Sequence, residues 1–113
     1  MRRVRVGSSV ILVPEDRDER MRGLRRRPGL EPNEGLLLEG CRSVHTFGMR
    51  FPIDAVLLDR RHRVVTVVRL PPRRLLRPRR HVRHVLEVAA GAGTLAILPG
   101  LPRTSLGPHR LEA

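Results

Sequence analysis

Cys41 and His45 are the first residues in this sequence that could do chemistry, because a thiol beside an imidazole is the pair that thiol enzymes use. On one extended strand, the four residue steps from Cys41 to His45 correspond to about 13 Å, which is too far for proton transfer. A chain reversal at residues 40–42 would be needed to bring the pair together. A small, buried or half-buried cysteine is the better interpretation, since cysteine packs as a small apolar side chain.

Two carboxylates, Asp54 and Glu87, lie inside apolar runs. A turn near residues 49–50 would place His45 opposite Asp54 or its neighbour, with Cβ atoms about 5 Å apart. Asp54 could then accept a hydrogen bond from His45, or it could simply satisfy backbone amides of the turn, which is the favoured interpretation. Glu87 is expected to face solvent or to pair with an arginine. No catalytic residue is assigned, and the candidate ligand-binding residues are His45, Thr46, Met49, Arg50, Asp54 and Glu87.

No metal ion or cofactor is predicted. A single cysteine excludes an internal disulfide and a cysteine-rich zinc site. His81 and His84 have a spacing that could share a helix face, but the arginines around them would repel a cation. The glycines at 91 and 93 lack a following helix that would present amide donors to a phosphate.

The formal charge of +12 raises the question of nucleic-acid binding, since clustered cations release counterions from phosphates. All 23 basic residues are arginine, which is typical of a GC-rich coding sequence. The chain has no tyrosine or tryptophan and only two phenylalanines on which bases could stack. A solvated arginine-rich surface is therefore predicted, and nucleic-acid binding is disfavoured.

The elements that position these residues are mainly strands. β-branched or alternating apolar patterns predict short strands within residues 4–13, 36–38, 43–47, 53–58, 64–68, 85–88 and 95–98. Val44 and Thr46 would share one face, with His45 and Phe47 on the other. The segment 59–63 predicts a hairpin connection in which Asp59 bonds the backbone two residues on. This pattern favours a mainly-β fold, an antiparallel β-sandwich or barrel.

One short helix is predicted near residues 16–26. Asp16 can cap it with Glu19 reaching back as in a capping box, and Met21 and Leu24 would form a narrow apolar stripe before Pro28 ends the helix. Residues 70–83 contain three prolines, six arginines and no acid, and predict a loop. Residues 1–101 are expected to form a single β domain, and residues 102–113 an irregular tail.

Four segments resemble the family known as domain of unknown function 192. They are Glu19 to Leu24, Glu34 to Leu38, Phe51 to Asp54 and Val85 to Gly91, in the order in which the family has them. The common members of the family have Phe-Trp-Met-Lys-Asn-Thr before the proline, whereas this chain has Val-His-Thr-Phe-Gly-Met at residues 44–49. Residues 41–54 instead resemble a distinct subgroup of the family. The resemblance implies a jelly-roll-like sandwich, and it supplies no reaction.

These observations favour a small binding or accessory domain over an enzyme, with a shallow pocket near residues 44–54 and a small molecule or a protein as its partner. The alternative is a hydrolase or lyase that uses His45 with Asp54 or Glu87. A minor alternative is electrostatic docking to nucleic acid or anionic lipid through residues 69–83. No stretch is long enough for a membrane helix, and no signal peptide is recognised, although some relatives are exported. A cytoplasmic location is therefore expected.

Overall fold

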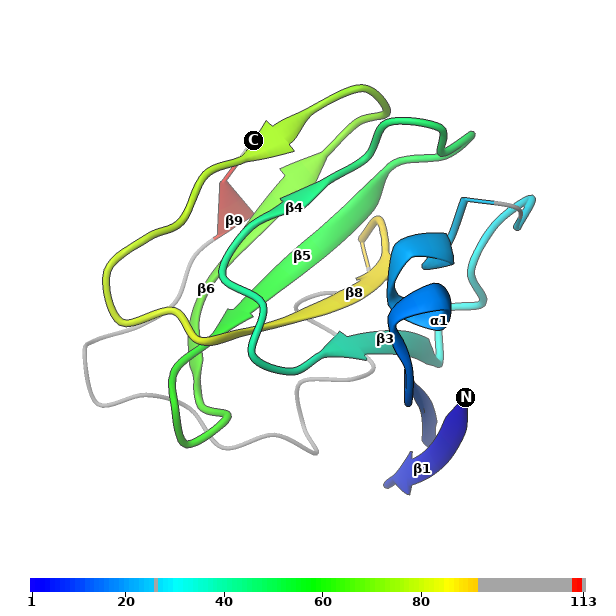
Figure 1. Cartoon of the computed structure of the whole chain (residues 1–113), viewed down its shortest axis with the longest axis horizontal. Coiled ribbons are helices and arrows are strands. Elements are labelled where there is room, and N and C mark those ends of the chain that lie inside the picture. Colours follow the sequence, from blue (N-terminus) through cyan, green and yellow to red (C-terminus); the bar gives the residue numbers. More distant parts are fainter. Residues whose placement is uncertain (26, 92–110, 113) are drawn as a thin grey trace.

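The computed structural model describes residues 1–25, 27–91 and 111–112, whose strands form two sheets. The larger sheet has seven strands in the order β1-β2-β3-β8-β5-β6-β9, and the smaller consists of β4 and β7 (Figure 1). The strands are β1 (Arg2–Val6), β2 (Ser9–Val13), β3 (Glu34–Leu38), β4 (Val44–His45), β5 (Ile53–Leu58), β6 (Val64–Leu70), β7 (Leu75–Leu76), β8 (His84–Ala89) and β9 (Leu111–Glu112). The mainly-β prediction is confirmed.

The larger sheet is mostly antiparallel, but β2 pairs with β3 and β6 pairs with β9 in parallel. Strand β8 comes late in the sequence and pairs with β3 on one side and β5 on the other. The described strands form an open sheet with β1 and β9 at its edges, so the alternative of a closed barrel is not what the chain adopts.

Strands β5 and β6 form the predicted hairpin, and their continuous apolar sequences are buried. The turn between them is fixed by Asp59, whose Oδ1 accepts the backbone N–H of Arg61 at 2.8 Å and of Arg63 at 2.9 Å. Burial acts to raise the pKa of Asp59, but these hydrogen bonds and the Arg63 guanidinium lower it below its ordinary value. The predicted bond to the residue two positions on is confirmed.

Alternation along β5 divides the core between the two faces of the larger sheet. Ile53, Ala55 and Leu57 belong to a cluster that also contains Val44 of β4 and Leu76 of β7. The smaller sheet therefore covers this face of the larger sheet. The opposite face carries a second apolar cluster, formed by Ile11, Val13, Val56, Leu58, Val64, Val67, Leu86 and Val88.

The short helix is confirmed as α1 (Arg17–Arg22), with Asp16 as its N-cap. The Asp16 carboxylate accepts the backbone N–H of Glu19 at 2.8 Å. Glu19 in turn accepts the backbone N–H of Glu15 at 2.9 Å, one residue earlier than a capping box predicts. The helix ends at Gly23, whose φ of 48° favours glycine.

Two expectations for this helix were wrong. It ends well before Pro28, so the proline is not what stops it. Met21 is 60% exposed, whereas Leu24 lies beyond the last turn and is buried in the core. The apolar stripe therefore does not exist, and the apolar residue that packs this segment into the core is Leu24, after the last turn.

The loop predicted at residues 70–83 contains regular structure at two places. Leu70 ends β6, and Leu75–Leu76 form β7 against β4. The hydroxyl of Thr46 donates to the carbonyl of Pro71 at 2.7 Å and accepts the backbone N–H of Arg74 at 2.9 Å. This segment is thus fixed to residues 44–46 by hydrogen bonds that its composition did not indicate.

The predicted strand at 95–98 lies outside the described residues, as does most of the tail from residue 102. Within that tail, Leu111–Glu112 form β9 beside β6. Among the described residues, no helix is long and apolar enough to cross a membrane.

Candidate functional site: a pocket above Glu87

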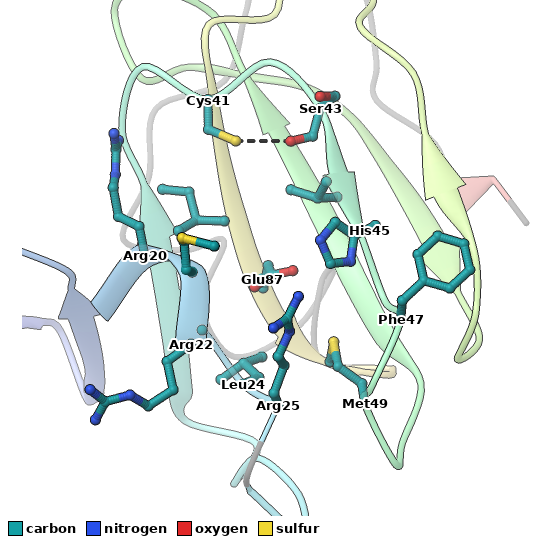
Figure 2. A pocket seen from close by; sticks show the side chains of 14 residues that line it. Arg20, Arg22, Leu24, Arg25, Cys41, Ser43, His45, Phe47, Met49 and Glu87 are labelled. Atoms are coloured by element: carbon teal, nitrogen blue, oxygen red, sulfur yellow. Dashed lines mark hydrogen bonds between the residues drawn. The ribbon is translucent and has the colours of Figure 1, made fainter. Parts of the chain in front are cut away.

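A pocket with a volume of about 140 Å³ opens on the face of the larger sheet that carries the smaller sheet (Figure 2). Its lining comes from α1 and the residues that follow it, from the end of β3, from residues 41–49 and from β8. Since a water molecule occupies ~30 Å³ in the liquid, the space suits an occupant of a few heavy atoms. Most of the wall is apolar, formed by Leu24, Leu38, Val44 and Met49.

Glu87 of β8 lies at the bottom of this pocket, and its side chain is only 4% exposed (Figure 2). Its neighbours across the sheet are Leu36 on β3 and Ala55 on β5. Among the described residues, none donates a hydrogen bond to its carboxylate or forms an ion pair with it. Burial alone raises its pKa to about 7. The expectation that Glu87 faces solvent or pairs with an arginine was wrong.

Arginines supply positive charge at the edge of the pocket. The Arg20 guanidinium donates to the backbone carbonyl of Glu39, which ties α1 to the end of β3. Arg25 lies over Gly48, where a Cβ atom would stand 3.7 Å from the Cγ and Cδ atoms of the arginine. In Figure 2 the Arg25 side chain extends toward the centre of the pocket, where Glu87 is seen.

The structure brings together only part of the predicted set of ligand-binding residues. His45, Met49 and Glu87 all line the pocket. Thr46 is fully buried and is occupied by its bonds to the segment after β6, and Arg50 is exposed outside the pocket lining. The predicted faces of residues 44–47 are confirmed, since Val44 and Thr46 are buried while His45 and Phe47 are exposed.

The alternative in which Asp54 accepts a hydrogen bond from His45 was wrong. Strand β4 pairs with β7, so His45 lies opposite Leu75. Asp54 lies on β5 opposite Arg69, whose Nε atom donates to it at 2.9 Å. Alternation places Asp54 on the face of the larger sheet away from Glu87, so it does not contribute to the pocket.

Cys41 also lines the pocket, as a free and half-buried thiol. Its Sγ atom donates to the backbone carbonyl of Ser43 at 2.8 Å. In Figure 2 the thiol points toward Ser43 rather than toward His45. The expectation of a small, half-buried cysteine is confirmed.

The residues from Arg20 to Arg25 were absent from the predicted site, because the sequence pattern treated them as a surface helix. A signal was present in the resemblance, which uses the segments 19–24, 34–38, 51–54 and 85–91 and the subgroup segment 41–54. Four of these segments, 19–24, 34–38, 41–54 and 85–91, supply lining residues to one pocket. Family segments that are far apart in the sequence could therefore have been considered together as parts of one site.

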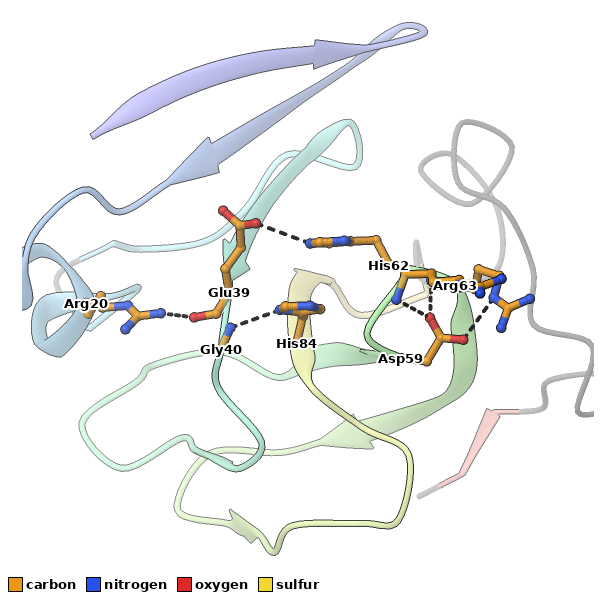
Figure 3. Close-up of polar contacts among 8 residues, drawn as sticks. Arg20, Glu39, Gly40, Asp59, His62, Arg63 and His84 are labelled. Carbon is orange, nitrogen blue, oxygen red and sulfur yellow. Dashed lines mark hydrogen bonds and ion pairs between the residues drawn. The ribbon is translucent and has the colours of Figure 1, made fainter.

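A second polar cluster lies at the end of β3 (Figure 3). The rings of His62 and His84 stack with centroids 4.0 Å apart, and His62 Nε2 lies 3.2 Å from the Glu39 carboxylate. The backbone N–H of Gly40 donates to His84 Nδ1 at 2.9 Å, so this nitrogen must be unprotonated. Burial, and then the charge of His62, lower the pKa of His84. The cluster holds the turn that leads into Cys41.

Within the described residues, no group of three or more histidine, cysteine or acidic side chains could hold a metal ion. The His62–Glu39 contact belongs to the hydrogen-bonded cluster at the end of β3.

The chain matches the model of the DUF192 family, described as "Uncharacterized ACR", over residues 4–100. This protein therefore belongs to that family, and the resemblance noted in its sequence is confirmed. A comparison with curated proteins finds no match. A crystal structure from Sinorhizobium meliloti 1021, provisionally described as that of a transcription regulator, is similar with a TM-score of 0.66 and 24% identity over 88% of each chain. At this identity, the similarity supports the fold alone.

Proposed function

We propose that this protein is a small-molecule-binding domain whose ligand occupies the pocket above Glu87. The observation that carries this proposal is the buried carboxyl group of Glu87, which has no partner among the described residues. An unpartnered buried carboxylate lowers stability. Groups of this kind are concentrated at functional sites, where a ligand provides the missing interaction.

The walls of the pocket support the same function. Apolar side chains with a few polar groups among them are typical of small-molecule sites, since the apolar area provides affinity and the polar groups set orientation. Here Leu24, Leu38 and Met49 provide apolar surface, while Glu87 and Arg25 are the polar groups. The hydrogen bond from Arg20 to Glu39 fixes one wall before a ligand arrives.

A second candidate is a hydrolase or lyase in which Glu87 acts as a general acid or base. The observation that favours it is the raised pKa of Glu87, about 7, since a carboxyl group that titrates near neutral pH suits proton transfer. His45 lines the same pocket and could take the second proton-transfer role. Binding is placed first because the described residues show no hydrogen bond that would orient His45 toward Glu87.

The test uses Cys41 as a reporter of pocket occupancy, because the chain has no other cysteine. A library of small polar compounds is screened for compounds that both raise the melting temperature and slow alkylation of Cys41 by iodoacetamide. Glu87→Gln should weaken binding of the compounds found. Asp59→Asn is the matched control, since Asp59 is a buried carboxylate in the hairpin turn, outside the pocket lining. The proposal fails if no compound protects Cys41, or if Glu87→Gln and Asp59→Asn bind alike.

A further inference from the structure

We propose that the ligand of this pocket is a small amino acid, with its ammonium group against Glu87 and its carboxylate against Arg25. This inference rests on the proposed binding function and names the chemical class of the ligand. It is drawn from two opposite charges that line one pocket and, among the described residues, form no ion pair with each other.

The bottom of the pocket requires a hydrogen-bond donor. Leu36 and Ala55 flank Glu87 on the neighbouring strands, and neither side chain can donate. A ligand that displaces water from Glu87 must therefore supply the donor itself. An ammonium group supplies three N–H donors and a compensating charge, whereas a hydroxyl group would leave the ionised carboxylate buried and uncompensated.

Arginine side chains in the pocket lining carry the charge opposite to that of Glu87. Arg20, Arg22 and Arg25 belong to the lining, which contains no acid other than Glu87. Arg20 is already bonded to a backbone carbonyl, and Arg22 points away from the pocket in Figure 2. Arg25 is the guanidinium that extends over the opening, with its stem packed on Gly48. A guanidinium binds a carboxylate through two parallel hydrogen bonds.

Ligands with a single charge match only one end of the pocket. A simple amine would satisfy Glu87, but it would be repelled by the arginines on entry. A simple carboxylate would satisfy Arg25, but it would leave Glu87 without a donor. A molecule with an ammonium group at one end and a carboxylate at the other satisfies both ends and carries no net charge into the site.

The space between the two ends is apolar, which suits methylene groups. Leu24, Leu38 and Met49 line it, within a pocket of about 140 Å³. The distance between the Glu87 carboxylate and the Arg25 guanidinium decides how many carbons must separate the two charges of the ligand. Short amino acids that differ in this number are therefore the ligands to compare.

The experiment compares 2-aminopentanoate, 4-aminobutanoate, 5-aminopentanoate and 6-aminohexanoate with pentan-1-amine and pentanoate, on the full chain. Cys41 alkylation and the melting temperature are measured at each concentration. We expect one of the amino acids to protect Cys41 at concentrations about tenfold lower than either singly charged compound, which corresponds to ~1.4 kcal/mol. Glu87→Gln should remove the advantage over pentanoate, and Arg25→Gln the advantage over pentan-1-amine. Arg22→Gln is the matched control and should remove neither.

The outcomes separate this inference from the function on which it rests. If pentanoate, pentan-1-amine or uncharged library compounds protect Cys41 as well as every amino acid does, the inference is overturned and the binding function stands. If no compound of any class protects Cys41, both are overturned. Equal effects of Arg22→Gln and Arg25→Gln would refute the assignment of the carboxylate to Arg25.

Discussion

Glu87 on β8 lies directly opposite Ala55 on β5, on the face of the larger sheet where the pocket opens. The Ala55 side chain is a single methyl group and cannot donate a hydrogen bond to the carboxylate. The carboxyl group of Glu87 is therefore flanked by an apolar neighbour on β5, while Glu87 also lines the pocket.

Glu87→Gln should raise the melting temperature at about pH 8 and change it little at about pH 4. The pKa of Glu87 is about 7 in the folded protein against an ordinary value of 4.5. The folded protein therefore keeps a proton that the unfolded chain has released between these values. The stabilising effect of the protonated group is complete below pH 4.5 and is lost as the pH rises to about 7. Thermal denaturation of both proteins across this range measures the effect, and parallel curves would contradict it.

Asp54→Asn should lower the free energy of unfolding by about 1–3 kcal/mol. The Asp54 carboxylate accepts from Arg69 Nε at 2.9 Å and from the backbone N–H of Gly91 at 2.8 Å. The asparagine amide carries no charge, and its NH₂ group would face either Arg69 Nε or the backbone N–H of Gly91, both of which are donors. His45→Ala is the comparison, and it should leave stability unchanged because His45 is exposed. Urea denaturation gives both values; equal losses would show that His45 has a structural role that its exposure does not indicate.

Local sequence patterns were sufficient to predict those elements that are formed by interactions between residues close together in the chain. The β5–β6 hairpin follows from two apolar runs around Asp59, and α1 follows from Asp16 and Glu19, because turns and caps use short-range hydrogen bonds. The order of the strands could not be obtained in this way. Pairing of β4 with β7 joins two-residue strands through backbone groups, and proline and arginine content obscured the second of them.

The candidate site was predicted in part for a similar reason. Alternation indicates which residues share a face of a strand, and it correctly separated His45 from Thr46. It does not indicate which faces are covered, so Glu87 was expected in solvent. The cover is supplied by α1, the residues after it and the smaller sheet, and only the three-dimensional arrangement shows this.

The stability of the protein should fall as the pH decreases below about 6.5 through the titration of His84. The pKa of His84 is lowered from 6.5 by burial and by His62, so the unfolded chain takes up the proton first. The contribution of neutral His84 to the free energy of unfolding is complete above pH 6.5 and is lost as the pH falls below that value. Protonation at Nδ1 would also remove the hydrogen bond from Gly40. The measurement is best made in the Glu87→Gln variant, since Glu87 titrates with the opposite sign. His84→Gln should abolish the dependence.

The arginines of residues 69–83 should bind DNA and anionic vesicles only weakly, with binding largely lost at about 0.15 M salt. Replacement of Arg73, Arg74, Arg79 and Arg80 by serine should remove the residual binding at low salt. Filter binding to two unrelated duplexes over a salt series gives the test. A preference for one duplex that disappears in the variant would show that this surface recognises nucleic acid.

Strand β8 lies between β3 and β5 in the sheet but is synthesised after both, so the site can form only late in translation. A nascent chain that has emerged only as far as β6 leaves the edges of β3 and β5 unpaired, because the strand that joins them has not yet been made. The same strand carries Glu87. The pocket therefore cannot exist in a chain in which β8 has not yet paired with β3 and β5. By mass action, a ligand that binds this pocket would add to the stability of the sheet that contains β8.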